Sequence, residues 1–148
     1  VITGNSMTNG NSFGGGIFSN GVLTVIDSTI SGNSLNAAGQ NTGCGLSNFG
    51  TLVQLINTTV SGNTCNGAGE NRGGGLATGS GVMRLINSTV VGNQAGGGSS
   101  TTRGGGIFVE GGAALVAALS AIRPAVRRIP TVVALLRPAF RRSCSATA

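Results

Sequence analysis

Short runs of alternating apolar and polar residues follow one another along the first 112 residues, separated by glycine and asparagine. The runs are rich in β-branched residues, and residues 23–25 and 28–31 are examples. Alternation of this kind predicts β-strands, and glycine and asparagine tolerate the positive φ angles of sharp corners. No segment before residue 112 has the period of an amphipathic helix. The pattern therefore predicts an all-β structure for this region.

The pattern repeats with a period near 30 residues. Three glycines followed by Ile or Leu occur at residues 14–17, 43–46, 73–76 and 104–107, with Cys44 replacing one middle glycine. A second block, which ends in Gly-Asn, recurs in phase at residues 26–33, 56–63 and 86–93. A repeat of this length made of short strands and tight corners predicts a β-solenoid. We expect about three full coils within residues 1–112.

Stacking of coils about 4.8 Å apart pairs each strand with its copies and aligns equivalent residues in columns. We expect Ile30, Val60 and Val90 to form an interior column, and Thr29, Thr59 and Thr89 an exterior one. The amides of Asn33, Asn63 and Asn93 are expected to bond from coil to coil at a corner. The remaining expected core residues are Ile17, Leu23, Val25, Leu46, Leu52, Leu76, Val82 and Ile107.

The glycine triplets and the Asn/Asp-Ser/Thr-Thr-Ile/Val-Ser-Gly-Asn block resemble the repeats of right-handed parallel β-helix proteins of bacterial surfaces. The resemblance is to polymorphic outer membrane proteins and autotransporter adhesins, within the pectate-lyase-like superfamily. It implies a right-handed parallel β-helix and an exported protein on the cell surface or outer membrane. It also implies that this chain, which opens in what should be the last strand of a coil, is a piece of a longer protein. It indicates no particular activity, because the same fold carries adhesins, lyases and passive stalks.

Residues 113–148 have a different composition. Glycine and asparagine give way to Ala, Val, Leu, Arg and Pro, and the next repeat block is missing. Three interpretations remain open. In the first, residues 113–122 form a helix that caps and packs on the open end of the solenoid. In the second, the tail is a basic membrane-surface segment whose apolar runs are too short to span a bilayer. In the third, the tail is the product of out-of-frame translation.

Charge and composition exclude several kinds of function. The chain has a net charge of +6 and no histidine, but residues 1–112 hold three arginines against Asp27, Glu70 and Glu110 and are neutral. The excess positive charge belongs to the tail, which argues against a nucleic-acid-binding face on the solenoid, as does the scarcity of aromatic residues. Three scattered acids give little basis for general acid–base catalysis or for a metal site. We therefore expect no catalytic residues, no metal and no cofactor.

Two arginines are the candidate binding residues. Arg72 and Arg103 each precede a glycine triplet and should stack in one column, where Phe13 and Thr42 hold the earlier places. The segments that lead to them are the variable parts of the repeat, and variable loops on a constant scaffold are common binding sites. An anionic glycan is the ligand these arginines would fit. The alternative is two solvated surface charges.

Two of the three cysteines, Cys44 and Cys65, lie within the repeats. A bridge between them is possible in an exported protein, although sequence spacing alone does not establish the required Cα approach. The function expected overall is that of a non-enzymatic adhesin-like or structural scaffold whose partners are an extracellular glycan, a host or cell-surface protein, and further coils of its parent protein. The alternative is a remnant of a carbohydrate-active β-helix enzyme with its active site outside this chain.

Overall fold

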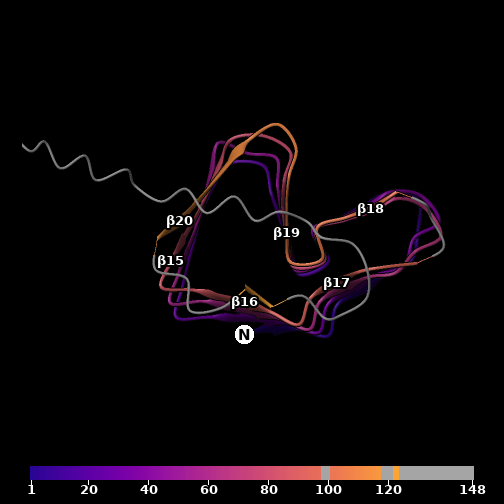
Figure 1. Ribbon diagram of the computed structural model, residues 1–148, viewed down its shortest axis with the longest axis horizontal. Helices are drawn as coiled ribbons and strands as arrows, with labels where there is room; N and C mark the ends of the chain where they lie inside the picture. Colours follow the sequence, from indigo (N-terminus) through magenta and orange to yellow (C-terminus); the bar gives the residue numbers. More distant parts are fainter. Residues whose placement is uncertain (98–100, 118–121, 124–148) are drawn as a thin grey trace, which may run out of the picture.

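The computed structural model describes residues 1–97, 101–117 and 122–123, which form a parallel β-solenoid. Successive coils superimpose when the molecule is viewed as in Figure 1. Each coil contributes one strand to each of five parallel sheets, which we name A to E. The strand pairs of these sheets are parallel among the described residues, and each pair joins one coil to the next.

The strands are short, with two to five residues each. Sheet A contains β1 (Ile2–Thr3), β6 (Thr29–Ser31), β11 (Thr59–Ser61), β16 (Thr89–Val91) and β21 (Ile122–Arg123). Sheet B contains β2 (Ser6–Met7), β7 (Ser34–Leu35), β12 (Thr64–Cys65) and β17 (Gln94–Ala95). Sheet C contains β3 (Ser12–Phe13), β8 (Asn41–Thr42), β13 (Asn71–Arg72) and β18 (Thr102–Arg103). Sheet D contains β4 (Ile17–Ser19), β9 (Leu46–Asn48), β14 (Leu76–Thr78) and β19 (Ile107–Val109), and sheet E contains β5 (Val22–Ile26), β10 (Leu52–Ile56), β15 (Val82–Ile86) and β20 (Ala113–Ala117).

The chain makes about four coils, because four strands line up in each of sheets B to E. The first strands of the chain complete one coil, and β20 and β21 extend the solenoid past residue 112. Residues 113–117, where one interpretation placed a cap helix, are paired with β15 as a strand. The remainder of the tail, residues 118–121 and 124–148, lies outside the described residues, as do the expectations that fall on it.

The main core fills the space enclosed by sheets A, D and E. The predicted interior column of Ile30, Val60 and Val90 is confirmed, since all three are fully buried. The core assignments of Leu52 and Val82 are wrong: Val53, Leu55, Met83 and Leu85 are the buried residues of these strands. The turn before β10 has one residue more than the turn before β5, so Leu52 pairs with the exposed Val22 rather than with Leu23.

Two columns of asparagine run from coil to coil. The buried ladder, Asn33, Asn63 and Asn93, lies between sheets A and B, and each amide oxygen accepts from the amide of the previous coil, at 2.9 Å for Asn33 to Asn63 and 2.8 Å for Asn63 to Asn93. Asn5 continues this ladder at 2.9 Å. The predicted coil-to-coil bonding is therefore confirmed. An exposed ladder of Asp27, Asn57 and Asn87 runs along the next corner of the coil.

The last glycine of the triplet is required by the next coil's backbone and by the buried ladder together. A Cβ atom added to Gly45 would lie 2.5 Å from the Gly75 carbonyl oxygen and 2.9 Å from the Asn63 amide nitrogen, and one added to Gly75 would lie 2.8 Å from the amide nitrogen of Asn93. Real Cβ contacts do not occur at these separations. The first glycine, as at Gly73, has a φ of +61° and turns the chain sharply from sheet C into sheet D.

A side lobe projects from the main body between sheets B and C (Figure 1). Its interior is polar: Asn41 and Asn71 are fully buried, and each bonds the backbone of its own loop. A disulfide joins Cys44 to Cys65, whose Cα atoms are 5.5 Å apart, at the neck between the lobe and the main core. Amide hydrogen bonds and one cross-link thus hold a lobe that has few apolar side chains.

Candidate functional site

The outward faces of sheets C and D meet at a re-entrant angle, which we call the corner. Sheet C contributes the column Phe13, Thr42, Arg72 and Arg103, and sheet D the column Phe18, Ser47, Ala77 and Phe108. The turn after sheet D adds Phe49 and Glu110. The two columns face each other, since the rings of Phe13 and Phe18 are 6.5 Å apart and the Arg72 guanidinium lies 5.4 Å from the Phe108 ring.

The first two coils form the aromatic end of the corner. Phe49 packs edge-to-face on Phe13 with ring centroids 5.4 Å apart, and it lies 5.9 Å from Phe18. The three rings line a hollow of about 140 Å³. Phe18 is 53% exposed and Phe49 is 36% exposed. The described surface also exposes aliphatic residues such as Val22 and Ile26, but Phe18 and Phe49 are its exposed aromatic residues and they lie in one cluster.

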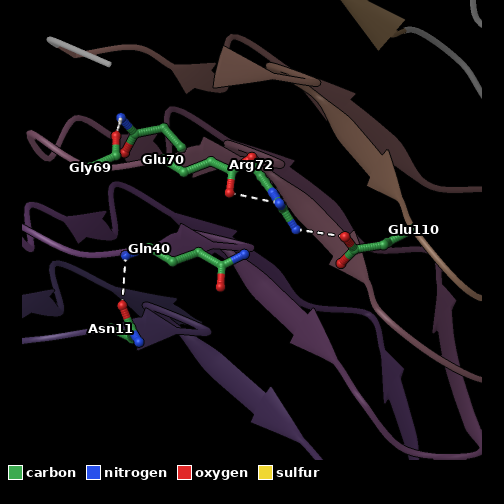
Figure 2. A network of polar contacts seen from close by, with 7 residues as sticks. Asn11, Gln40, Gly69, Glu70, Arg72 and Glu110 are labelled. Atoms are coloured by element: carbon green, nitrogen blue, oxygen red, sulfur yellow. Dashed lines mark hydrogen bonds and ion pairs between the residues drawn. The ribbon is translucent and has the colours of Figure 1, made fainter. Parts of the chain in front are cut away.

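The third and fourth coils form the charged end. Arg72 donates to Glu70 at 2.6 Å and to Glu110 at 2.7 Å, and only 14% of its side chain is exposed (Figure 2). The hydrogen bond with Glu70 raises the pKa of the Arg72 guanidinium above its ordinary value, although burial acts in the opposite direction. Arg72 is therefore held between two carboxylates and is not a free charge.

Arg103 completes this column, since it is the register partner of Arg72 as predicted. It is exposed, and the ion pairs found among the described residues do not involve it. The structure thus places the two predicted arginines together but in different roles. Arg72 joins Glu70 and Glu110 through ion pairs within the corner, and Arg103 exposes its charge to solvent.

Two hydroxyl groups lie between the aromatic and charged ends. Thr42 and Ser47 face the corner, yet both are buried. Their side-chain oxygens, and the Nε atom of Arg72, have no hydrogen-bond partner among the described residues. Thr42 and Ser47 thus separate the aromatic end from the charged end.

The acidic residues do not gather into a catalytic or metal-binding group within the described part of the chain. Glu70 and Glu110 share Arg72, whereas Asp27 accepts a hydrogen bond from Asn57 at 3.0 Å in the exposed ladder. No group of three His, Cys, Asp or Glu residues suited to a metal ion occurs among the described residues. Over the same residues, the structure contains no helix long and apolar enough to cross a membrane.

Sequence reasoning missed both the aromatic cluster and the role of Glu110. Glu110 reaches Arg72 across 38 residues of sequence, and its acidic type recurs in no other coil at that position. Phe13 was recognisable as a member of the arginine column, but its contact with Phe49 joins two different coils at positions that carry no repeated residue. Comparison of the chain with protein-family models, with curated proteins and with solved structures gave no match.

Proposed function

We propose that this chain is a non-enzymatic binding scaffold of an exported protein, with the corner as its contact surface. The observation that carries the proposal is a contrast between inward and corner columns. The inward columns repeat one chemistry, as in Ile30, Val60 and Val90, whereas the corner changes from phenylalanine to hydroxyl to charge along the same backbone. Variable residues on a constant scaffold are the usual arrangement of a binding surface.

The disulfide supports export. Cys44 and Cys65 are fully buried where they bridge the neck of the side lobe. Structural disulfides persist in oxidising compartments and are rare in reducing ones. The repeat itself resembles that of surface-displayed β-helix proteins, and an adhesin-like role on a cell surface or outer membrane is the specific form of scaffold that we infer.

The charge distribution favours binding over catalysis. Glu70 and Glu110 are already paired with Arg72, so neither is poised as a free general base. The anionic-glycan ligand becomes less favourable for the same reason, because Arg72 is compensated and Arg103 is the one exposed cation of this described column. A protein surface is the partner that best fits a corner with mixed aromatic, hydroxyl and compensated charged groups.

The proposal is tested with the full chain, produced under oxidising conditions and immobilised. Binding is measured by surface plasmon resonance against panels of acidic and neutral glycans and of extracellular matrix and cell-surface proteins, and depolymerisation of the glycans is followed in parallel. Phe49→Ser alters the corner, and the matched control Val22→Ser alters a residue that is 72% exposed on sheet E. Saturable binding that Phe49→Ser weakens and Val22→Ser does not would support the scaffold. Glycan cleavage, or no binding in either panel, would overturn it.

A further inference from the structure

Asparagine is followed directly by glycine at three places in the chain, residues 9–10, 20–21 and 66–67. Glycine has no side chain to shield its own backbone nitrogen. That nitrogen can therefore attack the side-chain carbonyl carbon of the preceding asparagine, with ammonia as the leaving group. Because the three dipeptides are chemically identical, their surroundings in the fold decide which of them react.

The pair at residues 20–21 is unshielded. Both residues are exposed in the turn between β4 and β5, and no atom lies within 4 Å of the place that a Cβ atom on Gly21 would occupy. The hydrogen bonds among the described residues do not include the Gly21 N–H or the Asn20 side chain, whereas the Gly21 carbonyl accepts from Leu52 at 3.3 Å. The attacking nitrogen and the carbon that it attacks are thus both unengaged.

The pair at residues 66–67 lies in the side lobe and has the opposite surroundings. The Gly67 N–H donates to Oδ1 of Asn71 at 3.2 Å, and Gly67 is buried. A Cβ atom on Gly67 would collide with the Ala37 carbonyl oxygen of the preceding coil. Attack by this nitrogen requires the lobe to open locally, so the fold protects Asn66.

The pair at residues 9–10 resembles the pair at residues 20–21. Asn9 and Gly10 are exposed, and no atom lies within 4 Å of a Cβ position on Gly10. Their carbonyl groups accept from Ser12 at 3.0 Å and from Gly39 at 3.1 Å. These bonds use the carbonyl oxygens and leave the Gly10 nitrogen available.

We propose that Asn20 is a site of spontaneous deamidation, that Asn9 is a second such site, and that Asn66 is protected. The Gly21 nitrogen gives its proton to solvent and forms a bond to Cγ of Asn20. The bond from Cγ to Nδ2 breaks, and the amide group takes up a proton and leaves as ammonia, which closes a succinimide ring. Water then adds to one ring carbonyl and breaks its bond to nitrogen, which yields aspartate or isoaspartate. One water is consumed and one ammonia released, with no change of oxidation state.

The product places a carboxylate at the aromatic end of the corner. Asn20 follows Phe18 by two residues, and its backbone packs against the turn that follows Phe49, since a Cβ atom on Gly50 would lie 2.6 Å from the Asn20 carbonyl carbon. Asp27 is the one charged side chain in residues 1–69 of the sequence. Deamidation therefore changes the charge of this region with time. The modification does not depend on the proposed function, but its effect on binding at the corner does.

The first experiment compares the native and unfolded chain. One sample of the full chain is incubated with its disulfide intact, at neutral and mildly alkaline pH, and another is reduced and unfolded in guanidinium chloride. Mass spectrometry with electron-transfer fragmentation measures aspartate and isoaspartate at each position. In the native chain Asn20 is expected to react at least about tenfold faster than Asn66, the factor that one buried hydrogen bond supplies.

The unfolded sample is the control for intrinsic reactivity. Its three sites are expected to react at similar rates, because they share one dipeptide. The native rate at Asn20 should rise with pH, since the attacking nitrogen acts in its deprotonated form. Equal rates at Asn20 and Asn66 in the native chain, or an Asn20 that reacts only after unfolding, would overturn the inference.

A variant tests the attacking atom. Gly21→Ala adds a methyl group for which the turn has room, so the fold should be kept while the nitrogen becomes shielded. Deamidation of Asn20 is expected to fall well below the wild-type rate, and Asn9 in the same sample should be unchanged. An unchanged rate at Asn20 would mean direct hydrolysis of the side chain and would contradict the mechanism.

The effect on the corner is measured with stable substitutes. Asn20→Asp represents the aged chain and Asn20→Gln the unaged one, and a partner that binds the corner is expected to distinguish them. If nothing binds the corner, the proposed function fails while the deamidation of Asn20 stands. If a partner binds and Asn20 stays intact in the aged native chain, the deamidation fails alone.

Discussion

Two ladders of asparagine side chains, one of which begins with Asp27, run along the same solenoid. They lie six residues apart in every coil and differ mainly in burial. Asn33, Asn63 and Asn93 are enclosed, with at most 1% of their surface exposed. Asp27, Asn57 and Asn87 lie at an open corner. Both ladders bond from coil to coil with similar geometry, at 2.8 Å between Asn63 and Asn93 and at 2.7 Å between Asn87 and Asn57.

The difference shows that the same repeated residue can serve two physical purposes. In the buried ladder the side chain satisfies backbone groups that water does not reach: the Asn63 oxygen accepts from the Asn33 main-chain N–H, and its nitrogen donates to the Ile30 carbonyl. In the exposed ladder the backbone conformation explains why asparagine or aspartate is present, because the chain turns there with a positive φ, which is +49° at Asn57. Asparagine and aspartate adopt that conformation more readily than other non-glycine residues.

The largest effect is expected from removing a buried amide. Asn63→Ala would leave the Asn33 N–H and the Ile30 carbonyl without partners in the interior. Unsatisfied buried groups cost about 1–3 kcal/mol each, so the free energy of unfolding should fall by about 4 kcal/mol. Urea denaturation followed by circular dichroism measures this. A loss below about 1 kcal/mol would mean that water enters the ladder and that burial does not distinguish the two columns.

The packing behind the buried ladder gives the next largest effect. Gly45→Ala would push a methyl group to 2.9 Å from the Asn63 amide nitrogen. The same methyl group would lie 2.5 Å from the Gly75 carbonyl oxygen. Overpacking costs about 1–3 kcal/mol, and the clash with this backbone atom places the loss at Gly45 near 3 kcal/mol. Gly21→Ala is the matched control, since nothing lies within 4 Å of a Cβ atom there. Equal stability of the two variants would show that the close packing of the coils at the ladder does not require the third glycine of the triplet.

Loss of the disulfide should affect the side of the coil that holds the buried ladder. Cys65 follows Asn63 by two residues, and its bond to Cys44 closes the neck of the side lobe. The Cys44→Ala, Cys65→Ala double variant should be less stable by about 2–3 kcal/mol. Hydrogen exchange should rise in the lobe and near Asn63 but stay unchanged at Asn57. Uniform exchange throughout would show that the neck is not an independent element.

The columns of the repeat could be predicted from sequence because their period is constant. Asn33, Asn63 and Asn93 are 30 residues apart, and so are Ile30, Val60 and Val90, so stacking alone aligns them. Sheet E was misaligned at Leu52 and Val82 because its strands are apolar on both faces. Alternation could not then reveal that the preceding turn had gained a residue.

The site could be predicted only in part. The stacking of Arg72 on Arg103 follows from the repeat, but the compensation of Arg72 depends on Glu70 and Glu110, which occupy no repeated column. The aromatic hollow requires Phe49 to fold back on Phe13 from the next coil. Neither feature is periodic, so the repeat predicts the scaffold but not the residues that differ from coil to coil.

The smallest effect is expected in the exposed ladder, and it separates backbone from side chain. Asn57→Ala should cost about 1 kcal/mol, because alanine is disfavoured at a φ of +49° by about 1–2 kcal/mol. Asn57→Gly loses the same hydrogen bonds to Asp27 and Asn87 but accepts this φ freely, so its stability should stay within about 0.5 kcal/mol of the wild type. Denaturation of both variants in parallel measures the difference. If glycine were as harmful as alanine, the side-chain bonds would be what matters at this corner, and the two ladders would work in the same way despite their different burial.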